Sequence, residues 1–178
     1  MSRLGIFCGA HAGRDGHYHA LAESIAEVLV ARGHGIVYGG GRVGLMGSLA
    51  DAMLRRGGEV IGVIPSALAT EEVAHGGVTA LHVVETMHER KALMAELSDA
   101  FIALPGGFGT MDEFHEIVTW RQLRIHDKPI GLLNPDGFYD HLLAQYERME
   151  SDGFLSRHAR ALFVSAAAIE ALLPLLRR

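Results

Sequence analysis

The sequence predicts an α/β protein with a mostly parallel, doubly wound sheet. Three observations lead to this prediction. Short apolar runs alternate with stretches of helical periodicity, glycine-rich turns follow two of these runs, and glycine makes up 22 of the 178 residues. Strands separated by helices of this length form parallel sheets with right-handed crossovers. We expect residues 1–178 to form one such domain, since this length suits a single hydrophobic core.

The expected elements follow in chain order. Apolar runs predict strands at residues 4–7, 35–38, 59–64, 79–84, 101–104 and 129–132, with a short edge strand at 161–164. Helical spacing predicts helices at residues 18–32, 43–56 and 87–97, after the turn at 105–109, and at 139–150 and 166–178. Ligands in such sheets bind at the carboxyl ends of strands near the topological switch point. Both glycine turns are expected at that edge.

Charge and cysteine content restrict the classes of function. The net charge is −5 and no basic run is present, so we expect no nucleic-acid polymer as partner. Cys8 is the single cysteine, which excludes an intrachain disulfide and a cysteine-based metal site, and we interpret it as a small buried residue. No signal peptide or apolar run of transmembrane length is visible, so we expect a cytoplasmic protein without a membrane partner.

The strongest functional signal is the turn at residues 105–113, Pro-Gly-Gly-Phe-Gly-Thr-Met-Asp-Glu. It joins a buried strand to a helix, and its glycines let a ligand approach the backbone. Free N–H groups at the helix start favour a phosphate there, as does the helix dipole. The residues expected to contact this ligand are Gly106, Gly107, Phe108, Gly109 and Thr110. Glu113 places a carboxylate one turn further on, although Thr110 and Glu113 also fit a capping box that needs no ligand.

A second glycine turn, Gly39-Gly40-Gly41, follows the second expected strand. It is not a Walker loop, because no Lys-Ser/Thr pair follows it. It also lacks the acidic residue that a dinucleotide fingerprint requires. Such a turn serves either tight helix–strand packing or the wall of a ligand site.

Charged residues elsewhere allow both structural and functional interpretations. Thr86 and Glu89 form a capping-box pattern, so we interpret Glu89 as structural. Arg90 and Lys91 lie near the start of the same helix, where the dipole disfavours cations. This local cost fits a functional role, and a solvated helix face explains the pair equally well. Glu72 lies in a polar loop, which by itself indicates a solvated surface.

The eleven histidines do not form a recognisable metal-binding pattern. His17 and His19 are two residues apart and therefore do not share a helix face. No HExxH sequence occurs. We expect neither a metal site nor a cofactor.

Taken together, these motifs resemble the Lonely Guy (LOG) family of cytokinin riboside 5′-monophosphate phosphoribohydrolases. The family signature PGGxGTxxE matches residues 105–113, and three further segments agree, at residues 38–47, 62–65 and 87–91. The resemblance covers residues 6 to about 164 and implies a Rossmann-like domain. It also implies hydrolysis of the N-glycosidic bond of an adenosine 5′-monophosphate, N6-modified or plain, releasing free base and ribose 5-phosphate.

The resemblance assigns roles to individual residues. Glu113 is expected to stabilise positive charge at the anomeric carbon or to orient water. Arg90 is expected to hold the substrate and to stabilise charge on the departing base. The other positions that the resemblance implies as substrate contacts are Glu72, Lys91, Thr119, Gly39, Gly40, Gly41 and Met46.

Family active sites lie at dimer interfaces, so the resemblance also implies a homodimer with the helices of Arg90 and Glu113 near the interface. The apolar residues Leu93, Met94, Leu97 and Trp120 near these two positions agree with this expectation.

Two other functions were weighed. The first is a non-catalytic nucleotide or molybdenum-cofactor carrier of similar fold. The second is the lysine decarboxylase that older annotation of the family suggests, which would need a Schiff-base lysine. Only Lys91 and Lys128 occur, and Lys128 precedes a strand at the wrong end of the sheet, so we reject that label.

The first loop departs from the family pattern. Where the family usually has Phe-Cys-Gly-Ser, residues 7–10 are Phe-Cys-Gly-Ala, and His11 follows. A hydroxyl that would reach the ligand is missing. We expect this change to alter how the first loop holds the nucleotide.

Overall fold

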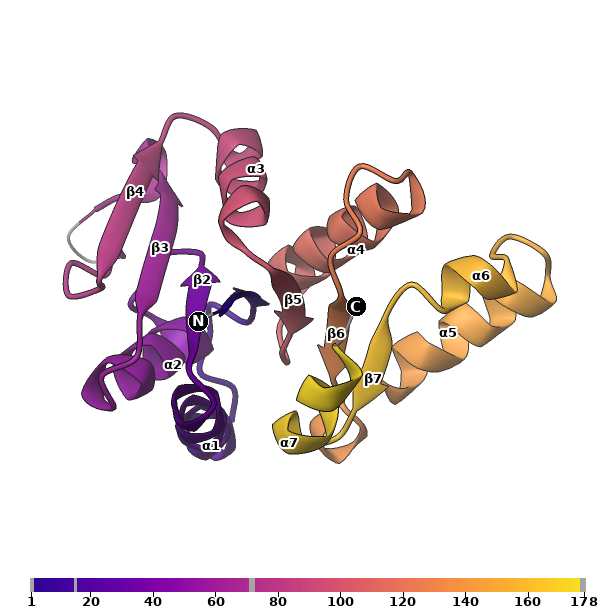
Figure 1. The fold of residues 1–178 in the computed structure, drawn as a ribbon, viewed down its shortest axis with the longest axis horizontal. Coiled ribbons are helices and arrows are strands. Elements are labelled where there is room, and N and C mark those ends of the chain that lie inside the picture. The colour runs from indigo at the N-terminus through magenta and orange to yellow at the C-terminus, as the bar shows by residue number, and fades with distance from the viewer. Residues whose placement is uncertain (1, 15, 71–72, 177–178) are drawn as a thin grey trace.

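The computed structural model describes residues 2–14, 16–70 and 73–176, and within them it contains one seven-stranded sheet (Figure 1). The strand order is β4-β3-β2-β1-β5-β6-β7, and every neighbouring pair is parallel. The strands are β1 (Ser2–Phe7), β2 (His34–Tyr38), β3 (Val60–Pro65), β4 (Ala80–Val84), β5 (Ala100–Ala103), β6 (Ile130–Leu133) and β7 (Val164–Ala166). The expected doubly wound α/β fold is confirmed.

A helix separates most consecutive strands, whereas β3 and β4 are joined by a short 3₁₀ turn. The helices are α1 (His17–Ala31), α2 (Gly44–Arg55), α3 (Met87–Leu97), α4 (Phe108–Gln122), α5 (Asp140–Ser151), α6 (Arg157–Arg160) and α7 (Ile169–Leu172). Short 3₁₀ turns are η1 (Ser66–Leu68), η2 (Pro135–Gly137) and η3 (Leu173–Leu175).

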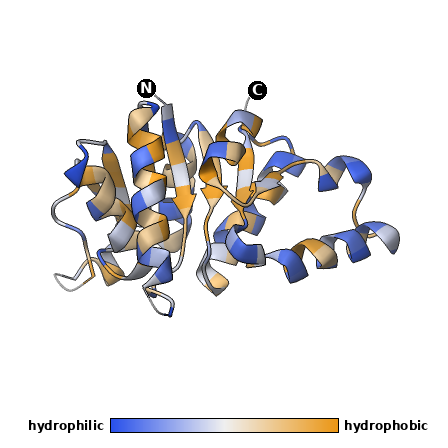
Figure 2. Cartoon of the chain, turned by 90° about the horizontal axis from the view of Figure 1, so that it is seen from below, coloured by the Kyte–Doolittle hydropathy of each residue, from blue (hydrophilic) through white to orange (hydrophobic). Residues whose placement is uncertain are grey.

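Two apolar layers bury the two faces of the sheet. One layer contains α1, α2 and α7, represented by Ile25, Met53 and Leu172. The other contains α3, α4 and α5, represented by Met94 and Phe114 among others. Figure 2 shows hydrophobic residues concentrated along the central strands and hydrophilic residues on the outward turns of the helices. Burial on both faces is what a parallel sheet requires, and it explains the continuous apolar runs of the strands.

The strand order reverses between β1 and β5, and this reversal positions the site. The register pairs Phe7 with Ala103, so the two carboxyl ends lie side by side. Just beyond them, the N–H of Gly9 donates to the carbonyl of Pro105 over 3.1 Å. The first loop and the 105–107 turn are therefore tied together at the switch point, where ligands bind in such folds.

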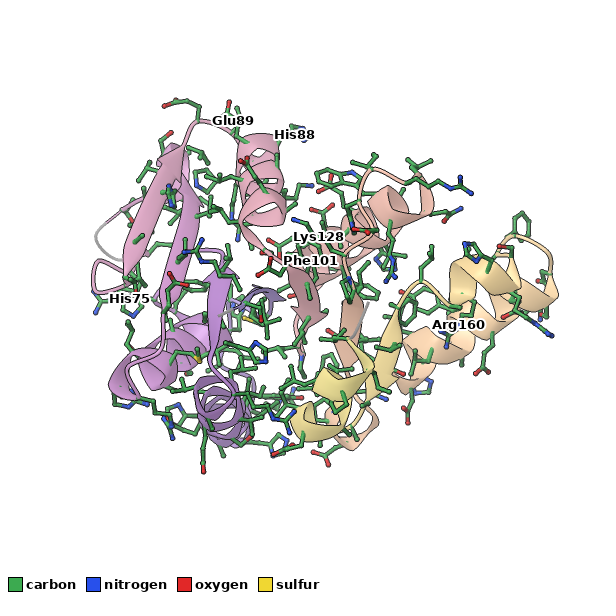
Figure 3. All side chains as sticks on the ribbon, in the orientation of Figure 1. His75, His88, Glu89, Phe101, Lys128 and Arg160 are labelled. Carbon is green, nitrogen blue, oxygen red and sulfur yellow. The ribbon has the colours of Figure 1, made fainter. Side chains whose placement is uncertain are left out.

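A segment that we call the roof loop, residues 73–75, lies across the second glycine turn. The N–H of Arg42 donates to the carbonyl of Val73 over 2.8 Å, and the N–H of His75 donates to the carbonyl of Gly40 over 2.9 Å. The side chain of His75, which is labelled in Figure 3, contacts Asp51 of α2, with 3.0 Å between Nε2 and Oδ1. Backbone pairing therefore joins the loop before β4 to the loop after β2.

Both ends of α3 are fixed by side chains. Thr86 Oγ1 accepts the N–H of Glu89 over 3.1 Å, and Glu89 Oε2 accepts the N–H of Glu85 over 2.9 Å. This confirms the structural interpretation of Glu89. At the other end, Lys128 Nζ donates to the carbonyl of Ala95 over 2.6 Å. Figure 3 labels Glu89 and Lys128 near opposite ends of the helix.

The C-terminal region differs from the sequence-based expectation in two ways. The edge strand is Val164–Ala166 rather than 161–164, because residues 161–163 form the turn that follows the short helix α6, whose N-cap is Ser156. The expected closing helix at 166–178 was also wrong. Helix α7 ends at Leu172, and a 3₁₀ turn containing Pro174 follows. Proline lacks an N–H and its ring clashes with the preceding helical turn, so an α-helix does not continue through it.

No helix within residues 2–14, 16–70 and 73–176 is both long and apolar enough to cross a bilayer.

Candidate functional site

A cavity of about 660 Å³ lies at the carboxyl edge of the sheet, at the switch point. It is bordered by the first loop, the second glycine turn with the start of α2, the end of β3, and the turn into α4. The expected site residues that line it are Gly39, Gly41, Met46, Arg90, Gly106, Gly107, Phe108, Gly109, Thr110 and Glu113. The fold thus brings together most of the residues that were singled out in separate segments of the sequence.

The start of α4 presents backbone N–H groups to this cavity. The helix begins at Phe108, its N-cap is Gly107, and no side chain caps it. The first backbone bond of the helix runs from the N–H of Met111 to the carbonyl of Gly107. The N–H groups of residues 108–110 have no intrahelical acceptor, as in the first turn of any helix. They and the helix dipole suit an anion.

Thr110 is not the N-cap, so the capping-box interpretation of Thr110 and Glu113 is wrong. The helix starts two residues earlier, and Thr110 is buried in its first turn with an exposure of 3%. Its hydroxyl lies directly against the Cα of Gly106, where any side chain would overlap it. Gly106 is therefore a glycine because Thr110 occupies the space of its side chain.

Glu113 and Arg90 form an ion pair next to this helix start. The distance from Arg90 Nη1 to Glu113 Oε1 is 2.9 Å, and the two side chains are only 12% and 9% exposed. Arg90 Nε also donates to the carbonyl of Val63 over 3.1 Å. The guanidinium thus connects α3, α4 and the end of β3, and it holds the Glu113 carboxylate at the cavity wall.

Burial and charge act in opposite directions on Glu113. Burial raises the pKa of the Glu113 carboxyl above its ordinary value, and the neighbouring Asp112 adds to that rise. The guanidinium of Arg90 lowers the same pKa by stabilising the ionised form, and Lys91 does so more weakly. Arg90 is the largest influence that favours the ionised form of Glu113, and burial outweighs it, so the pKa is raised overall.

Cys8 lies in the cavity wall close to this pair. Burial raises the pKa of its thiol far above the ordinary value, and the carboxylate of Glu113 raises it further. A buried cysteine with such a pKa remains a neutral thiol and is a poor nucleophile.

Four expected substrate contacts do not line the cavity of this chain, or cannot be placed. Lys91 Nζ contacts Asp112 Oδ2 at 3.2 Å and Glu116 Oε1 at 3.1 Å on α4. Thr119 is exposed on the same helix. Gly40 packs its Cα against β3 and has a left-handed backbone with φ of 72°, so it shapes the turn. Glu72 lies outside the described residues.

The two lysines of the chain lie away from the cavity wall. Lys91 is paired with α4, and burial alone would lower its pKa, but the carboxylates of Glu116 and Asp112 raise it overall. Lys128 is held by backbone carbonyls at the end of α3. Neither amine is placed for a Schiff base with a ligand in this cavity.

Sequence reasoning missed an aromatic pair at the cavity. Tyr18 at the start of α1 and Phe138 after η2 both line it, and their rings meet edge to face with centroids 6.2 Å apart. The roof loop adds Val73, and η1 adds Leu68. No local pattern marks these residues, because their neighbourhood is created only when the sheet assembles. In the part of the chain that the structure describes, no three His, Cys, Asp or Glu side chains gather as metal ligands.

Comparison with known proteins identifies the family. The family model described as "Possible lysine decarboxylase" matches residues 46–176. A probable cytokinin riboside 5′-monophosphate phosphoribohydrolase from Oryza sativa subsp. japonica is 50% identical, over 97% of this chain and 78% of the relative. A protein with that enzyme name from Rhodococcoides fascians is 49% identical, over 97% of this chain and 87% of its own. The chain belongs to the LOG family.

Solved structures share this α/β fold. The molybdenum cofactor binding protein from Rippkaea orientalis superposes with a TM-score of 0.72 at 20% identity, covering 98% of this chain and 94% of that one. The molybdenum cofactor carrier protein from Chlamydomonas reinhardtii gives 0.72 at 19% identity, covering 98% and 95%. At these identities the likeness concerns the fold alone.

The ion pair predicts how Glu113 titrates. Replacing Arg90 with alanine removes the group that lowers the pKa of Glu113, so that pKa should rise further. Carbon-13 NMR of the glutamate side-chain carboxyls measures it, with Glu113→Gln identifying the resonance. Arg148→Ala, which removes an exposed guanidinium of α5, is the matched control and should leave the pKa unchanged. An unchanged or lower pKa in Arg90→Ala would contradict this account of the site.

Proposed function

We propose that this LOG-family chain hydrolyses the N-glycosidic bond of adenosine 5′-monophosphates, N6-modified or plain, releasing free base, a cytokinin or adenine, and ribose 5-phosphate. The main support is that the buried Glu113–Arg90 ion pair lines the same cavity as the uncapped N-terminus of α4. Relatives about half identical over most of both chains bear the name of this activity, which supports the proposal.

The spacing along α4 suits a ribose 5-phosphate. Gly109 and Glu113 are four residues apart, which is about 6 Å along the axis at about 1.5 Å per residue. The 5′-phosphorus and the anomeric carbon of a ribose 5-phosphate are separated by a similar length. In this proposal a phosphate on the N–H groups of residues 108–110 leaves the anomeric carbon within reach of the Glu113 carboxylate.

The reaction breaks the bond between the anomeric carbon and the base nitrogen. The sugar ring becomes positively charged in the oxocarbenium-like transition state, and the buried Glu113 carboxylate stabilises that charge and orients the attacking water. The water supplies the hydroxyl of ribose 5-phosphate, and its proton ends on the base. Arg90 favours the ionised form of Glu113 and offsets negative charge that develops on the base.

The remaining wall of the cavity is apolar and is suited to the base. Val43, Ile64, Leu68 and Val73 line it. Apolar side chains suit the faces of a purine ring and an apolar N6 substituent. The carrier alternative gains no support from this site, since the structural likeness to cofactor carriers extends only to the fold.

We also propose that the chain forms a homodimer near α3 and α4. Met94 does not support this, because it is buried in the core of its own chain. Better support comes from Leu123 and Ile125, which follow α4 and are 65% and 64% exposed. Thr119 is exposed on the same helix, away from the cavity of its own chain. A substrate contact for Thr119 therefore requires a second copy.

Replacing the catalytic pair should abolish most turnover. Glu113→Gln and Arg90→Ala should each lower kcat by about 10²-fold or more, since charge-stabilising groups contribute about 10²–10⁴-fold. Purified protein is incubated with a panel of adenosine, N6-isopentenyladenosine, guanosine and cytidine monophosphates, and the released bases are separated by chromatography. Glu147→Gln on the exposed face of α5 is the matched control. Near wild-type release by Glu113→Gln would show the catalytic assignment to be wrong.

Removing the 5′-phosphate should reduce kcat/KM strongly, because the start of α4 then has no anion to bind. The same assay with nucleoside and nucleotide measures this ratio. Thr110→Val removes the hydroxyl at nearly constant volume and should lower kcat/KM for the nucleotide alone. Equal kcat/KM for nucleoside and nucleotide would exclude the start of α4 as a phosphate site.

Light scattering should give twice the mass of one chain at micromolar concentration. Leu123→Glu should shift the protein toward the monomer, because it would bury a charge at the proposed interface. Phe154→Glu changes a residue that is 88% exposed in the α5–α6 connection and should leave the dimer intact. A monomeric wild-type protein would overturn the proposal.

A further inference from the structure

Gly39 lies where β2 ends, beside the ion pair of the site. Its backbone angle is outside the left-handed region, so the main chain at this position accepts any residue. A side chain is excluded for another reason. An added Cβ would overlap Nη2 of Arg90 and would lie 3.1 Å from Cζ of Arg90. The guanidinium thus fills the space in which a side chain of residue 39 would lie.

The three nitrogens of the Arg90 guanidinium reach three other elements, and Nη1 also donates to Sδ of Met87 on α3 over 3.2 Å. Nε donates to the carbonyl of Val63 at the end of β3, over 3.1 Å. Nη1 lies 2.9 Å from Glu113 Oε1 on α4. Nη2 lies over the bare Cα of Gly39 at the end of β2. The guanidinium is therefore held between three segments. On the side of β2 it packs against the backbone of Gly39, where there is no side chain.

We propose that Gly39 is a positioning residue for the reaction: the absence of its side chain lets the Arg90 guanidinium lie against Glu113. This rests on the proposed function. It differs from the expectation that Gly39 contacts the nucleotide, because here the glycine acts through Arg90. The other two glycines of the turn have different constraints. Gly40 needs its left-handed backbone, and a Cβ on Gly41 would lie 3.0 Å from Cε of Met46.

An alanine at position 39 separates function from folding. Its methyl group would meet mainly the end of a flexible arginine side chain and the thioether of Met46 at 3.3 Å. Both contacts are with the ends of flexible side chains rather than with backbone, so the protein should still fold. The guanidinium, however, must move by about 1 Å or more, and a shift of about 1 Å at a catalytic group can cost about 10²-fold in rate.

A double-mutant cycle tests the proposal. Gly39→Ala alone should lower kcat by about 10–10²-fold with an unchanged unfolding midpoint in urea. In an Arg90→Ala background the same substitution should lower kcat by less than about 3-fold, because the group that it displaces is gone. Gly76→Ala, at an exposed glycine with no atom within 4 Å of the added Cβ, is the matched control and should be neutral. Losses that multiply in the double variant would show that Gly39 acts on the substrate directly and would overturn the proposal.

Two further measurements test the proposal without requiring catalytic turnover. A crystal structure of Gly39→Ala should show Arg90 Nη1 farther from Glu113 Oε1 than the present 2.9 Å. Carbon-13 NMR should show the pKa of Glu113 rising, as expected for Arg90→Ala. If wild-type protein hydrolysed none of the nucleotides, the proposed function would fail, and these measurements would still decide the role of Gly39. An unmoved Arg90 in the variant structure would refute that role.

Discussion

The buried ion pair between Arg90 and Glu113 is the constraint on which the rest of the site depends. Removing two charges from water is unfavourable unless their geometry is fixed and their remaining hydrogen-bonding groups are satisfied. Here the pair is 2.9 Å apart, and the carbonyl of Val63 takes a further guanidinium hydrogen. The partners come from α3, α4 and β3, which meet only because the strand order reverses between β1 and β5. The topology of the sheet therefore determines which residues meet at the site.

The relative position of α3 and α4 is set by contacts outside the cavity. Lys91 follows Arg90 in the sequence and pairs with Asp112 and Glu116, which flank Glu113 on α4. Lys128 closes the end of α3 by donating to its last carbonyls. The residues that carry the proposed chemistry and those that align the two helices thus alternate along the same segments. This arrangement explains why charged residues cluster around Arg90 and Glu113 in the sequence.

Sequence periodicity predicted the fold well, because apolar spacing reports directly on which face of an element is buried. The turn into α4 was predicted as a ligand site, but the start of the helix was not. The spacing between Thr110 and Glu113 fits a capping box but does not show where the helix begins. In the structure Gly107 is the N-cap, so the helix begins before Thr110. The predicted length of the C-terminal helix was too great, because the prediction followed the apolar composition of the segment and neglected the helix-breaking effect of Pro174. The aromatic wall of Tyr18 and Phe138 was missed because its two halves are joined only by tertiary structure.

The roof loop is attached to the second glycine turn through backbone hydrogen bonds from Arg42 and His75. Its contribution to the cavity, Val73, together with Leu68 of η1, comes from segments that carry neither member of the ion pair. Substitutions at these two positions change the shape of the apolar wall. The contacts that hold the Arg90–Glu113 ion pair are not affected, because they are made by other segments. Under the proposed function, recognition of the base and cleavage of the bond rest on separate segments, so base preference can diversify within one scaffold without rebuilding its reactive centre.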